Sequence, residues 1–491
     1  MRLLLGAGLF ALFLACAPQK AARKPTLPST PALVASAPDT EGFRKQRPAA
    51  GRPGSFQYPT PAVIELPNGF RVLHVQRPGR VVSLTLVLRH GASSVPEGKS
   101  GLAGLVARML SESTRRRPAM ALAEAVESLG TTLSAAAGRD DSRVSMTVLP
   151  ADFEPAVRLL GEVVMEPAFA PRDFERVKNE WLDNVRAERQ DPQRLAMLTA
   201  VRALNGPLLG APVNGSLSHV NRLGVADLKD FHARAYTPDN AALIVVGAVD
   251  EASVRSEATR LFGGWRGKNG IAGPVATPVV PPQTTRILIV DRPDAVQTAI
   301  AAAQPFPKRS EPGHEARELM VTTLGGLFTS RLNTNLREQN AFTYGAFAHS
   351  QEGRHLGTLV LGTSVRTPVT AKALVEIRSE LTALAGAKPV TDQELARARA
   401  DLTFTLGATL EHPTRIASVV STLFSEALPL DYYTRFAAQI EGVSAQEVLD
   451  TSRLLAPDKL LVVLVGDQKQ IVPELTRAGF PSERATPELT E

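Results

Sequence analysis

The segment from Ala242 to Val249 reads ALIVVGAV, and the segment from Leu460 to Val465 reads LLVVLV. Both are short apolar runs rich in β-branched residues, and this pattern predicts an apolar β-strand in each place. Gly247 lies in the first run and Gly466 follows the second, 219 residues later. A strand of the same kind therefore ends each half of the chain, which suggests that the two halves repeat.

Further landmarks share this spacing. Asp173 and Asp392 begin two predicted helices and are also 219 residues apart, and those helices end near two X-Pro steps that are 221 residues apart. A common offset over three landmarks predicts a duplication, and the period is far too long for a solenoid. We expect an α+β protein of two homologous α/β-roll domains, with antiparallel-rich sheets, packed helices and a Gly/Pro-rich linker. Each domain would have about 200 residues, enough for its own core.

Hydrophobic periodicity places the elements within each half. Strands are expected to alternate or to be apolar throughout, and helices to repeat apolar residues every three or four positions. The predicted strands are 82–88, 143–149, 242–249, 286–290, 297–303, 344–349, 358–361 and 460–465. The predicted helices are 119–129, 151–165, 173–189, 319–336, 371–385 and 392–410. The first domain would span residues 62–262, followed by a linker (263–284), the second domain (285–480) and a tail (481–491).

The amino end predicts export from the cytoplasm. One arginine precedes an apolar run, residues 3–15, that is shorter than the ~20 residues that a membrane-crossing helix needs. We interpret residues 1–15 as a signal peptide. Residues 13–16 read FLAC and resemble a bacterial lipobox, so Cys16, the one cysteine of the chain, would become lipidated. Ordinary signal-peptidase cleavage, giving a soluble secreted protein, and a retained anchor are the alternatives.

Residues 16–61 are expected to form a tether. They hold nine prolines, and seven basic residues against two acidic ones. Such a segment cannot bury enough apolar area to offset its ordering entropy. It would either favour an anionic lipid surface or act only as a spacer. With Arg2 it accounts for the whole net charge of +6, so the body of the 491-residue chain is electrically balanced, which argues against a nucleic-acid-binding body.

Several common kinds of active site are missing from the sequence. No two of the eight histidines are four residues apart, so no helix would present a local pair of imidazole ligands. The nucleophile-elbow spacing G-x-S-x-G does not occur. Residues 91–100, GASSVPEGKS, end like a phosphate loop, but six residues instead of four separate the two glycines. Pro96 also removes a backbone N–H from any phosphate cradle.

Residues 98–110 read GKSGLAGLVARML. This stretch resembles the G-K-T-G-L-A-H-F-L-E-H-M-L stretch of the pitrilysin/insulinase family of zinc metallopeptidases, which use an inverted H-x-x-E-H motif. Residues 231–250 also resemble the signature at the end of the family's first domain. The resemblance covers about residues 63–467, most of the mature chain.

The resemblance places this chain's residues at the family's zinc positions. Gly104 and Arg108 stand where the family has its two histidine ligands, and Ala107 stands where it has the water-activating glutamate. The third ligand position falls on Asn184. Zinc-dependent hydrolysis needs three ligands and a base. We therefore expect a degenerate zinc site, no metal, and no catalytic residue in this chain alone. A separate metal site on the nearby Glu180, Asp183 and Glu188 is the alternative to a solvated helix face.

The second half keeps a different part of the family pattern. Residues 328–346, FTSRLNTNLREQNAFTYGA, resemble the family's C-terminal substrate motif, in which an arginine and a tyrosine seven positions later face the active site. Here these are Arg337 and Tyr344. The resemblance implies that the pair binds the substrate carbonyl oxygen and supports the oxyanion, for which a guanidinium and a phenol are suitable donors. The alternative is a salt-bridged arginine and a tyrosine packed in the sheet.

These observations lead to two functional hypotheses. The first is a non-catalytic, substrate-binding subunit of an envelope-associated zinc metallopeptidase, tethered on the periplasmic face of the outer membrane. It would pair with a zinc-bearing homologous subunit, form a heterodimer, and supply Arg337 and Tyr344 to a shared chamber that encloses peptides. Zinc would be needed only in the partner. The second hypothesis is a peptide-binding or scaffold lipoprotein of the bacterial envelope without peptidase activity.

Overall fold

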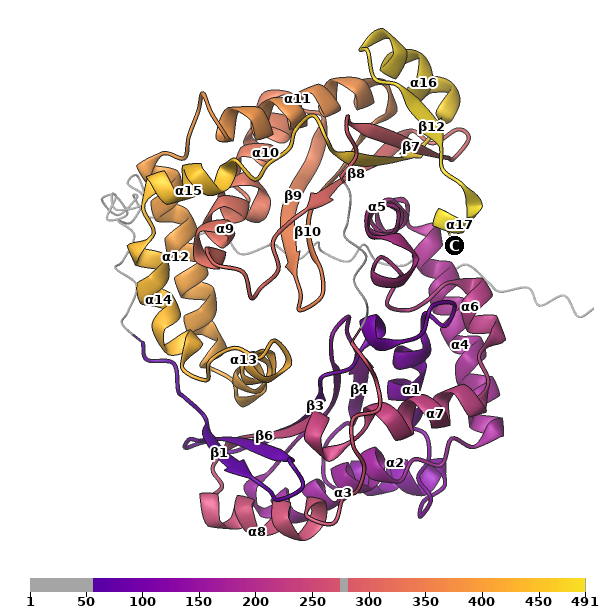
Figure 1. Ribbon diagram of the computed structural model, residues 1–491, viewed down its shortest axis with the longest axis vertical. Helices are drawn as coiled ribbons and strands as arrows, with labels where there is room; N and C mark the ends of the chain where they lie inside the picture. The colour runs from indigo at the N-terminus through magenta and orange to yellow at the C-terminus, as the bar shows by residue number, and fades with distance from the viewer. Residues whose placement is uncertain (1–55, 274–280, 491) are drawn as a thin grey trace, which may run out of the picture. The chain divides into compact units, whose positions relative to one another are not determined.

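The computed structural model describes residues 56–273 and 281–490. The predicted signal peptide, Cys16 and most of the predicted tether lie outside these residues, as does part of the predicted linker. The described chain contains two six-stranded sheets, each with its own set of helices (Figure 1). The expected α+β fold with two sheet-and-helix units is confirmed.

Residues 56–273, the described part of the first half, contain six strands and eight α-helices. The strands are β1 (Ala62–Glu65), β2 (Arg71–Gln76), β3 (Val82–Leu88), β4 (Ser134–Ala137), β5 (Ser142–Val148) and β6 (Ala241–Gly247). The helices are α1 (Leu102–Leu110), α2 (Ala119–Glu127), α3 (Phe153–Met165), α4 (Pro171–Gln190), α5 (Pro192–Leu209), α6 (Leu217–Arg222), α7 (Val225–Ala235) and α8 (Glu251–Phe262).

The second half contains six strands and nine α-helices. The strands are β7 (Arg286–Asp291), β8 (Gln297–Pro305), β9 (Thr343–Glu352), β10 (Gly357–Arg366), β11 (Leu461–Gly466) and β12 (Ser482–Arg484). The helices are α9 (His314–Val321), α10 (Arg331–Asn333), α11 (Thr370–Leu384), α12 (Asp392–Thr409), α13 (Pro413–Ser425), α14 (Tyr432–Gly442), α15 (Ala445–Ser452), α16 (Gln468–Arg477) and α17 (Pro487–Thr490).

The two sheets repeat the same topology. Their strand orders are β1-β2-β6-β3-β5-β4 and β12-β7-β11-β8-β10-β9. In each sheet an interior strand, β6 or β11, pairs parallel with one neighbour and antiparallel with the other. The outermost strands differ, because β1 is antiparallel to β2 whereas β12 is parallel to β7. Five strands of each sheet thus correspond, as the shared offset in the sequence predicts.

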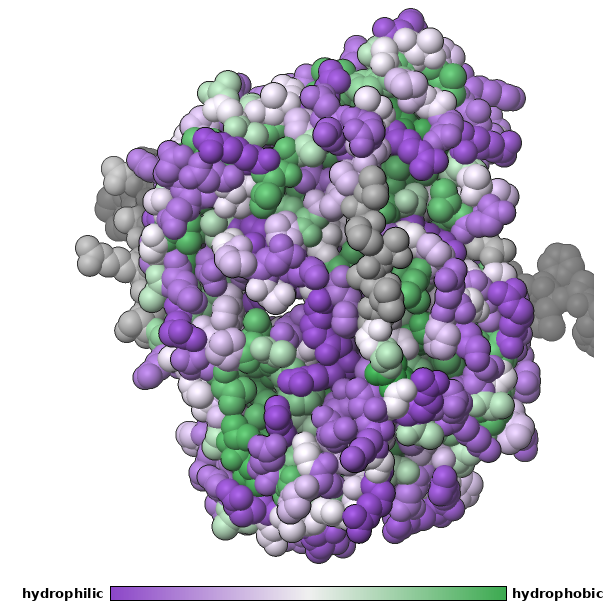
Figure 2. All heavy atoms as spheres, in the orientation of Figure 1, coloured by the Kyte–Doolittle hydropathy of each residue, from purple (hydrophilic) through white to green (hydrophobic). Residues whose placement is uncertain are grey.

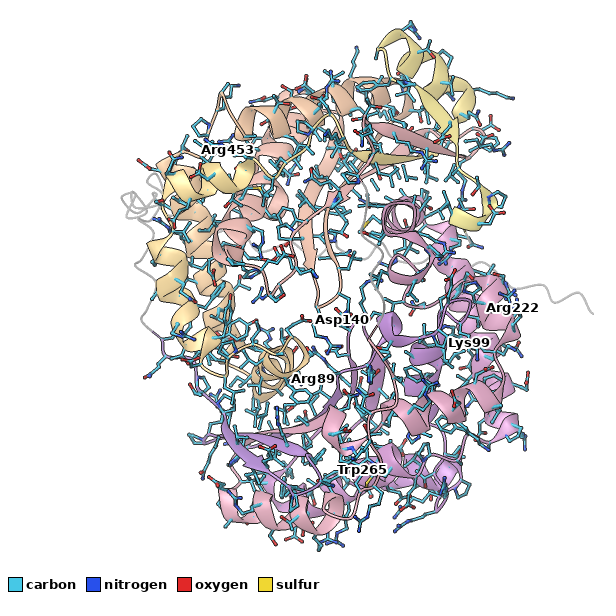
Figure 3. The ribbon with its side chains drawn as sticks, in the orientation of Figure 1. Arg89, Lys99, Asp140, Arg222, Trp265 and Arg453 are labelled. Atoms are coloured by element: carbon cyan, nitrogen blue, oxygen red, sulfur yellow. The ribbon has the colours of Figure 1, made fainter. Side chains whose placement is uncertain are left out.

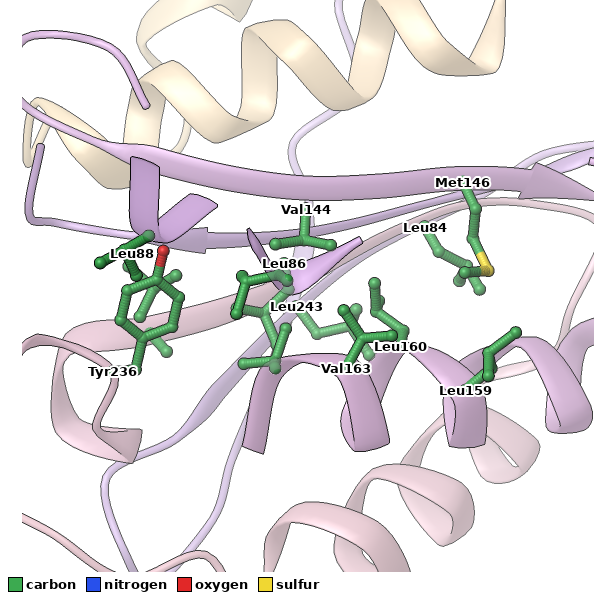
Figure 4. Close-up of a cluster of buried hydrophobic side chains, with 14 of the residues drawn as sticks. Leu84, Leu86, Leu88, Val144, Met146, Leu159, Leu160, Val163, Tyr236 and Leu243 are labelled. Carbon is green, nitrogen blue, oxygen red and sulfur yellow. The ribbon is translucent and has the colours of Figure 1, made fainter. Parts of the chain in front are cut away.

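Each sheet has one face covered by helices of its own half. In β3 the side chains of Leu84, Leu86 and Leu88 point to the same side, because strand residues alternate between the two faces. They meet Leu160 and Val163 of α3 in a buried cluster (Figure 4). Each fully buried aliphatic side chain of this kind contributes roughly 1.5–3 kcal/mol.

The opposite face of each sheet is covered by a helix from the other half. α13 packs on β3 and β6, where Val420 and Phe424 contact Ile244 and its neighbours. α5 packs on β8 and β11, where Leu195 and Val201 join their buried residues (Figure 1). This exchange explains why β3, β6 and β11 are buried along their whole length.

One predicted element is wrong. The stretch 319–336 was expected to be a single helix, but α9 ends at Val321 and runs into a π-helical turn, Thr322–Gly326. The chain then leaves the helical conformation before the short helix α10 and a second π-helical turn, Thr334–Gln339. The apolar periodicity continues across the interruption, so it did not reveal the break at Leu327, whose backbone is extended.

The visible face in Figure 2 is mostly hydrophilic, with smaller apolar patches. Within the described part of the chain, none of the helices combines the length and the apolar composition that a membrane crossing would require.

Candidate functional site

The stretch that resembles the zinc motif forms the start and body of α1. Gly101 precedes the helix with φ of 93°, in the left-handed region, and a Cβ there would lie 2.8 Å from the carbonyl oxygen of Asn214. Only glycine fits this turn without strain. The sequence frame of the motif is therefore kept for a structural reason, independent of any metal.

Gly104 faces an aromatic side chain of α4. A Cβ built on Gly104 would lie 2.5 Å from Cζ2 and 2.7 Å from Cη2 of Trp181. The indole is held in place, since its Nε1 donates a hydrogen bond to the carbonyl oxygen of Asn214 at 2.8 Å. The place that a ligand side chain at this position would need is thus filled by tryptophan.

Arg108 belongs to a network of ion pairs between α1 and α4. Its guanidinium pairs with Glu112, one turn later, and lies 3.8 Å from Glu180. Arg176 pairs with the same two carboxylates, at 2.7 Å from Glu180. The carboxylate of Glu112 is nearly buried, and the hydrogen bond to Glu180 raises the pKa of Arg176. Two cations and two anions therefore balance one another here.

The remaining positions offer no metal-binding group either. Ala107 is fully buried, and Asn184 lies on the exposed side of α4. The nearby acidic residues have partners of their own: Asp183 pairs with Arg186, and Glu188 with Arg194. These pairings agree with a solvated, ion-paired helix face. Zinc does not fit the residues at this place, and we derive no hydrolytic step from them.

A three-residue group in the second half also has to be considered. Within residues 56–273 and 281–490, His314, Glu318 and Glu352 form the one group of three side chains spaced closely enough to share a metal ion. Two guanidinium groups occupy the same surroundings: Arg309 contacts the His314 ring, and Arg317 pairs with Glu352 at 2.8 Å. These fixed cations satisfy Oε2 of the Glu352 carboxylate and oppose a metal cation, so we interpret the group as a buried ion-pair cluster.

Arg337 and Tyr344 lie together in an open pocket. The pocket has a volume of about 490 Å³, and its lining also includes Gln297 and Arg366. All of its lining residues belong to the second half of the chain. The side chain of Tyr344 is 93% exposed, so it is not packed in the sheet. The pair is therefore on the surface and is not completed by residues of the first half.

The guanidinium of Arg337 is positioned by weak contacts. Its Cζ lies 4.1 Å from the centre of the Phe328 ring, a cation–π contact, and its Nε lies 3.4 Å from a carboxylate oxygen of Glu338. Stacking on an aromatic face leaves the in-plane N–H groups available for a carbonyl or carboxylate oxygen. Arg337 lies in the π-helical turn Thr334–Gln339, and such turns are frequent at functional sites.

The sequence analysis did not identify Trp181, which packs beside Gly104, or Phe328, which stacks on Arg337. Trp181 lies in a charged stretch of α4, three positions before Asn184, and its contact with Gly104 depends on how α1 and α4 face each other, for which the sequence carries no signal. Phe328 is 68% exposed and supports Arg337, but it lies nine positions away, within the non-helical stretch that precedes α10. No periodicity in the sequence connects the two.

Two family models match this chain in succession. The model of insulinase (peptidase family M16) matches residues 71–211, and the model of the peptidase M16 inactive domain matches residues 222–402. The chain belongs to peptidase family M16. The two matches follow one another along this M16 chain, and the second begins at residue 222 in the first half and ends at residue 402 in the second.

Individual relatives agree with this assignment. An uncharacterized zinc protease of Mycobacterium leprae is 28% identical over 349 residues, which cover 69% of this chain and 76% of the relative. The non-peptidase homolog YmxG of Helicobacter pylori is 26% identical over 376 residues, 74% and 84% of the two chains. The crystal structure of a peptidase M16 inactive domain from Pseudomonas fluorescens matches with a TM-score of 0.77 and 25% identity, over 83% of this chain and 98% of that one.

The names of these relatives include both proteases and a non-peptidase. Whether this M16 chain has the catalytic groups of a peptidase therefore has to be judged from its own residues. Gly104, Ala107, Arg108 and Asn184 supply none of the side chains that the family uses for zinc and water. The chain is an inactive, peptidase-like member of the family. Arg337 and Tyr344 of the second half are the residues that the resemblance places at the family's substrate motif.

Proposed function

We propose that this chain is a non-catalytic, substrate-binding subunit of an envelope-associated zinc metallopeptidase that degrades peptides. It would form a heterodimer with a homologous subunit that has intact zinc ligands, and the zinc would be bound by that partner. Cys16 would carry the lipid that holds the chain on the periplasmic face of the outer membrane. A soluble periplasmic or secreted form is the alternative location.

The exposure of the Arg337–Tyr344 pair is the observation that supports this proposal. A phenol that is 93% exposed makes little contribution to folding, and the surrounding pocket is lined only by the second half. A pair of donors on an open surface is suited to act on a substrate that another chain holds. Arg337 would donate to the carbonyl oxygen under attack and Tyr344 would support the same oxygen, as preorganised donors do for developing negative charge.

The test is to mix this chain with a zinc-bearing member of the family from the same organism. We expect cleavage of a quenched fluorescent peptide by the mixture, at a rate that neither chain reaches alone. Arg337→Ala should lower turnover by ~10²-fold, as removal of one oxyanion donor commonly does. Arg435→Ala is a matched control, because this arginine of α14 is also exposed and paired with one acid, and it should leave turnover unchanged.

Two results would count against the proposal. A mixture that cleaves no faster than its separate components would refute the shared chamber, and full activity of the Arg337→Ala mixture would refute the role of that residue. Peptide binding by the chain without any stimulated cleavage would favour the second candidate, a peptide-binding or scaffold lipoprotein. Labelling with a palmitate analogue, compared with Cys16→Ser, tests the location separately.

A further inference from the structure

A second pocket lies where the two halves of the chain meet. Its volume is about 440 Å³, within the range of roughly 300–1,000 Å³ typical of small-molecule sites. Its walls come from the β4–β5 turn, α5, the loop 210–213, the β9–β10 hairpin and the end of α13. None of its lining residues is shared with the pocket of Arg337, so the two pockets are separate.

Hydrogen bonds from the hairpin fix one side of this pocket. Asp140, labelled in Figure 3, accepts a hydrogen bond from the backbone N–H of Arg354 at 2.9 Å and from the hydroxyl of Ser93 at 2.7 Å. The Arg354 guanidinium donates to the carbonyl oxygens of Arg89 and Asp140. The carboxylate of Asp140 is thus committed to holding the two halves together.

A cation in this pocket has no anionic partner. Arg139 donates to the carbonyl oxygen of Leu209, but within the described residues no carboxylate oxygen lies within 4 Å of its guanidinium. The neighbouring Asp140 is occupied by Ser93 and Arg354. Burial lowers the pKa of Arg139, which reflects the cost of keeping this charge out of water.

An anion in the same pocket has no cationic partner. Glu426, just after α13, has one carboxylate oxygen that is buried and without a hydrogen-bond partner. In the described ranges of the chain no basic nitrogen lies within 4 Å of it. The pKa of Glu426 is raised to about 7, mainly because the carboxylate is removed from water and secondly because the negative charge of Asp140 is near. Unpaired buried charges are costly and are usually found where a ligand or a metal satisfies them.

Most of the rest of the pocket is apolar or already paired: Glu352 pairs with Arg317 through Oε2, and its Oε1 is buried without a hydrogen-bond partner. Met197, Leu198 and Val201 of α5 line one wall, and Leu356 of the hairpin contributes another aliphatic surface. The other arginines of the lining have acidic partners: Arg194 pairs with Glu188, and Arg143 with Asp141. Among the described residues of the lining, Arg139 and Glu426 therefore remain as a cation and an anion without an ion-pair partner, with an aliphatic surface beside them.

We propose that this pocket binds a zwitterionic short peptide of about dipeptide size. The ammonium of the peptide would pair with Glu426, its carboxylate with Arg139, and its aliphatic side chains would contact α5. A ligand with only one kind of charge would leave either Arg139 or Glu426 unsatisfied. This inference goes beyond the proposed function, and it concerns the chain alone, so either can fail without the other.

Titration calorimetry with leucyl-leucine tests the proposal on the chain without any partner. Acetylating the amine or amidating the carboxylate of the dipeptide should each weaken binding by about 10-fold or more, the usual loss of one charge-assisted hydrogen bond. Glu426→Gln should weaken binding of leucyl-leucine to the same extent, and acetylation should then cost almost nothing further. Arg139→Gln should remove the effect of amidation in the same way.

The controls separate binding from folding. Glu441→Gln changes an exposed acid of α14 and should bind like the unmodified chain. Arg139 also donates to the backbone carbonyl oxygens of Leu209 and Ala211, so its substitution can disturb folding. The binding result for Arg139→Gln is therefore used only if its circular dichroism spectrum is unchanged. If that spectrum changes, Glu426→Gln alone tests the proposal. No heat of binding with leucyl-leucine, or equal affinity for the free and the acetylated dipeptide, would overturn the proposal.

Discussion

The residues at the expected zinc position are packed and ion-paired, whereas the pocket of Arg337 and Tyr344 is open to solvent. In the first half, Trp181 fills the space beside Gly104, and Glu112 binds the arginine that stands at a ligand position. In the second half, Tyr344 stays 93% exposed in an open pocket. Residues that lose a chemical role are free to become part of the packing. Residues that remain exposed without a packing role require another explanation, and here we propose a partner and a substrate.

The largest expected effect tests whether Trp181 occupies the space beside Gly104. Gly104→Ala should destabilise the chain by about 2–3 kcal/mol, because the added methyl group overlaps the anchored indole of Trp181. The sign is informative, since alanine in a helix is otherwise favoured over glycine by roughly 1 kcal/mol. Urea unfolding of the two chains measures the difference.

Gly161→Ala in α3 is the matched control. Its added Cβ would lie 3.4 Å from the Met165 side chain, an ordinary contact, so this change should be neutral or stabilising. Combining Gly104→Ala with Trp181→Leu should recover most of the loss. If Gly104→Ala stabilises the chain as much as Gly161→Ala does, the space beside α1 is not filled in solution.

A second change probes the ion-pair network between α1 and α4. Glu112→Gln should cost about 1–2 kcal/mol, because Glu112 is nearly buried and pairs with both Arg108 and Arg176. The two arginines are partly exposed and can hydrate, which limits the loss. Glu154→Gln, in an exposed pair with Arg158, should change stability by less than about 0.5 kcal/mol. Equal effects in urea unfolding would mean that the network is only a surface feature.

Much of the fold followed from sequence, because strand alternation, helix periodicity and the 219-residue offset are local or repeated signals. The sequence did not show that α5 and α13 exchange sheets, although the uninterrupted apolar runs of β6 and β11 indicated strands covered on both faces. The missing ligand at Gly104 and the missing base at Ala107 were readable from the motif alone. The filling by Trp181 was not, since it depends on which residues of α1 and α4 face each other.

The pocket between the halves differs from both sites, because its Glu426 has no ion-pair partner among the residues that the structure describes. Ionising this carboxylate therefore costs folding free energy. Burial raises the pKa of Glu426 to about 7, above its ordinary value of 4.5. Below the ordinary value both folded and unfolded chains hold the proton, so the group costs nothing. Between about pH 4.5 and 7 the unfolded chain releases this proton while the folded chain keeps it, so stability falls over this range and is lowest above about pH 7, where the folded chain holds the ionised form.

Glu426→Gln removes this cost. Because the side chain is partly exposed, the variant should be more stable than the unmodified chain by only about 1–2 kcal/mol near pH 8, and equally stable near pH 4. Thermal unfolding over this pH range measures the difference between the two chains. A variant that is less stable than the unmodified chain at high pH would show that the carboxylate has a stabilising partner in the folded protein.

The smallest expected effect tests whether Tyr344 contributes to the stability of the fold. Tyr344→Ala should change the free energy of unfolding by less than about 0.5 kcal/mol, because a side chain that is 93% exposed buries almost no apolar area on folding. Tyr432→Ala is the contrasting variant, since this tyrosine of α14 packs against Phe436 and donates to Glu315 at 2.8 Å, and its loss should be clearly larger. A Tyr344→Ala loss of the same size would give the residue a structural role, and its exposure would then no longer support a function in another chain's site. A near-zero loss leaves recognition as the remaining reason for a large aromatic side chain in that place.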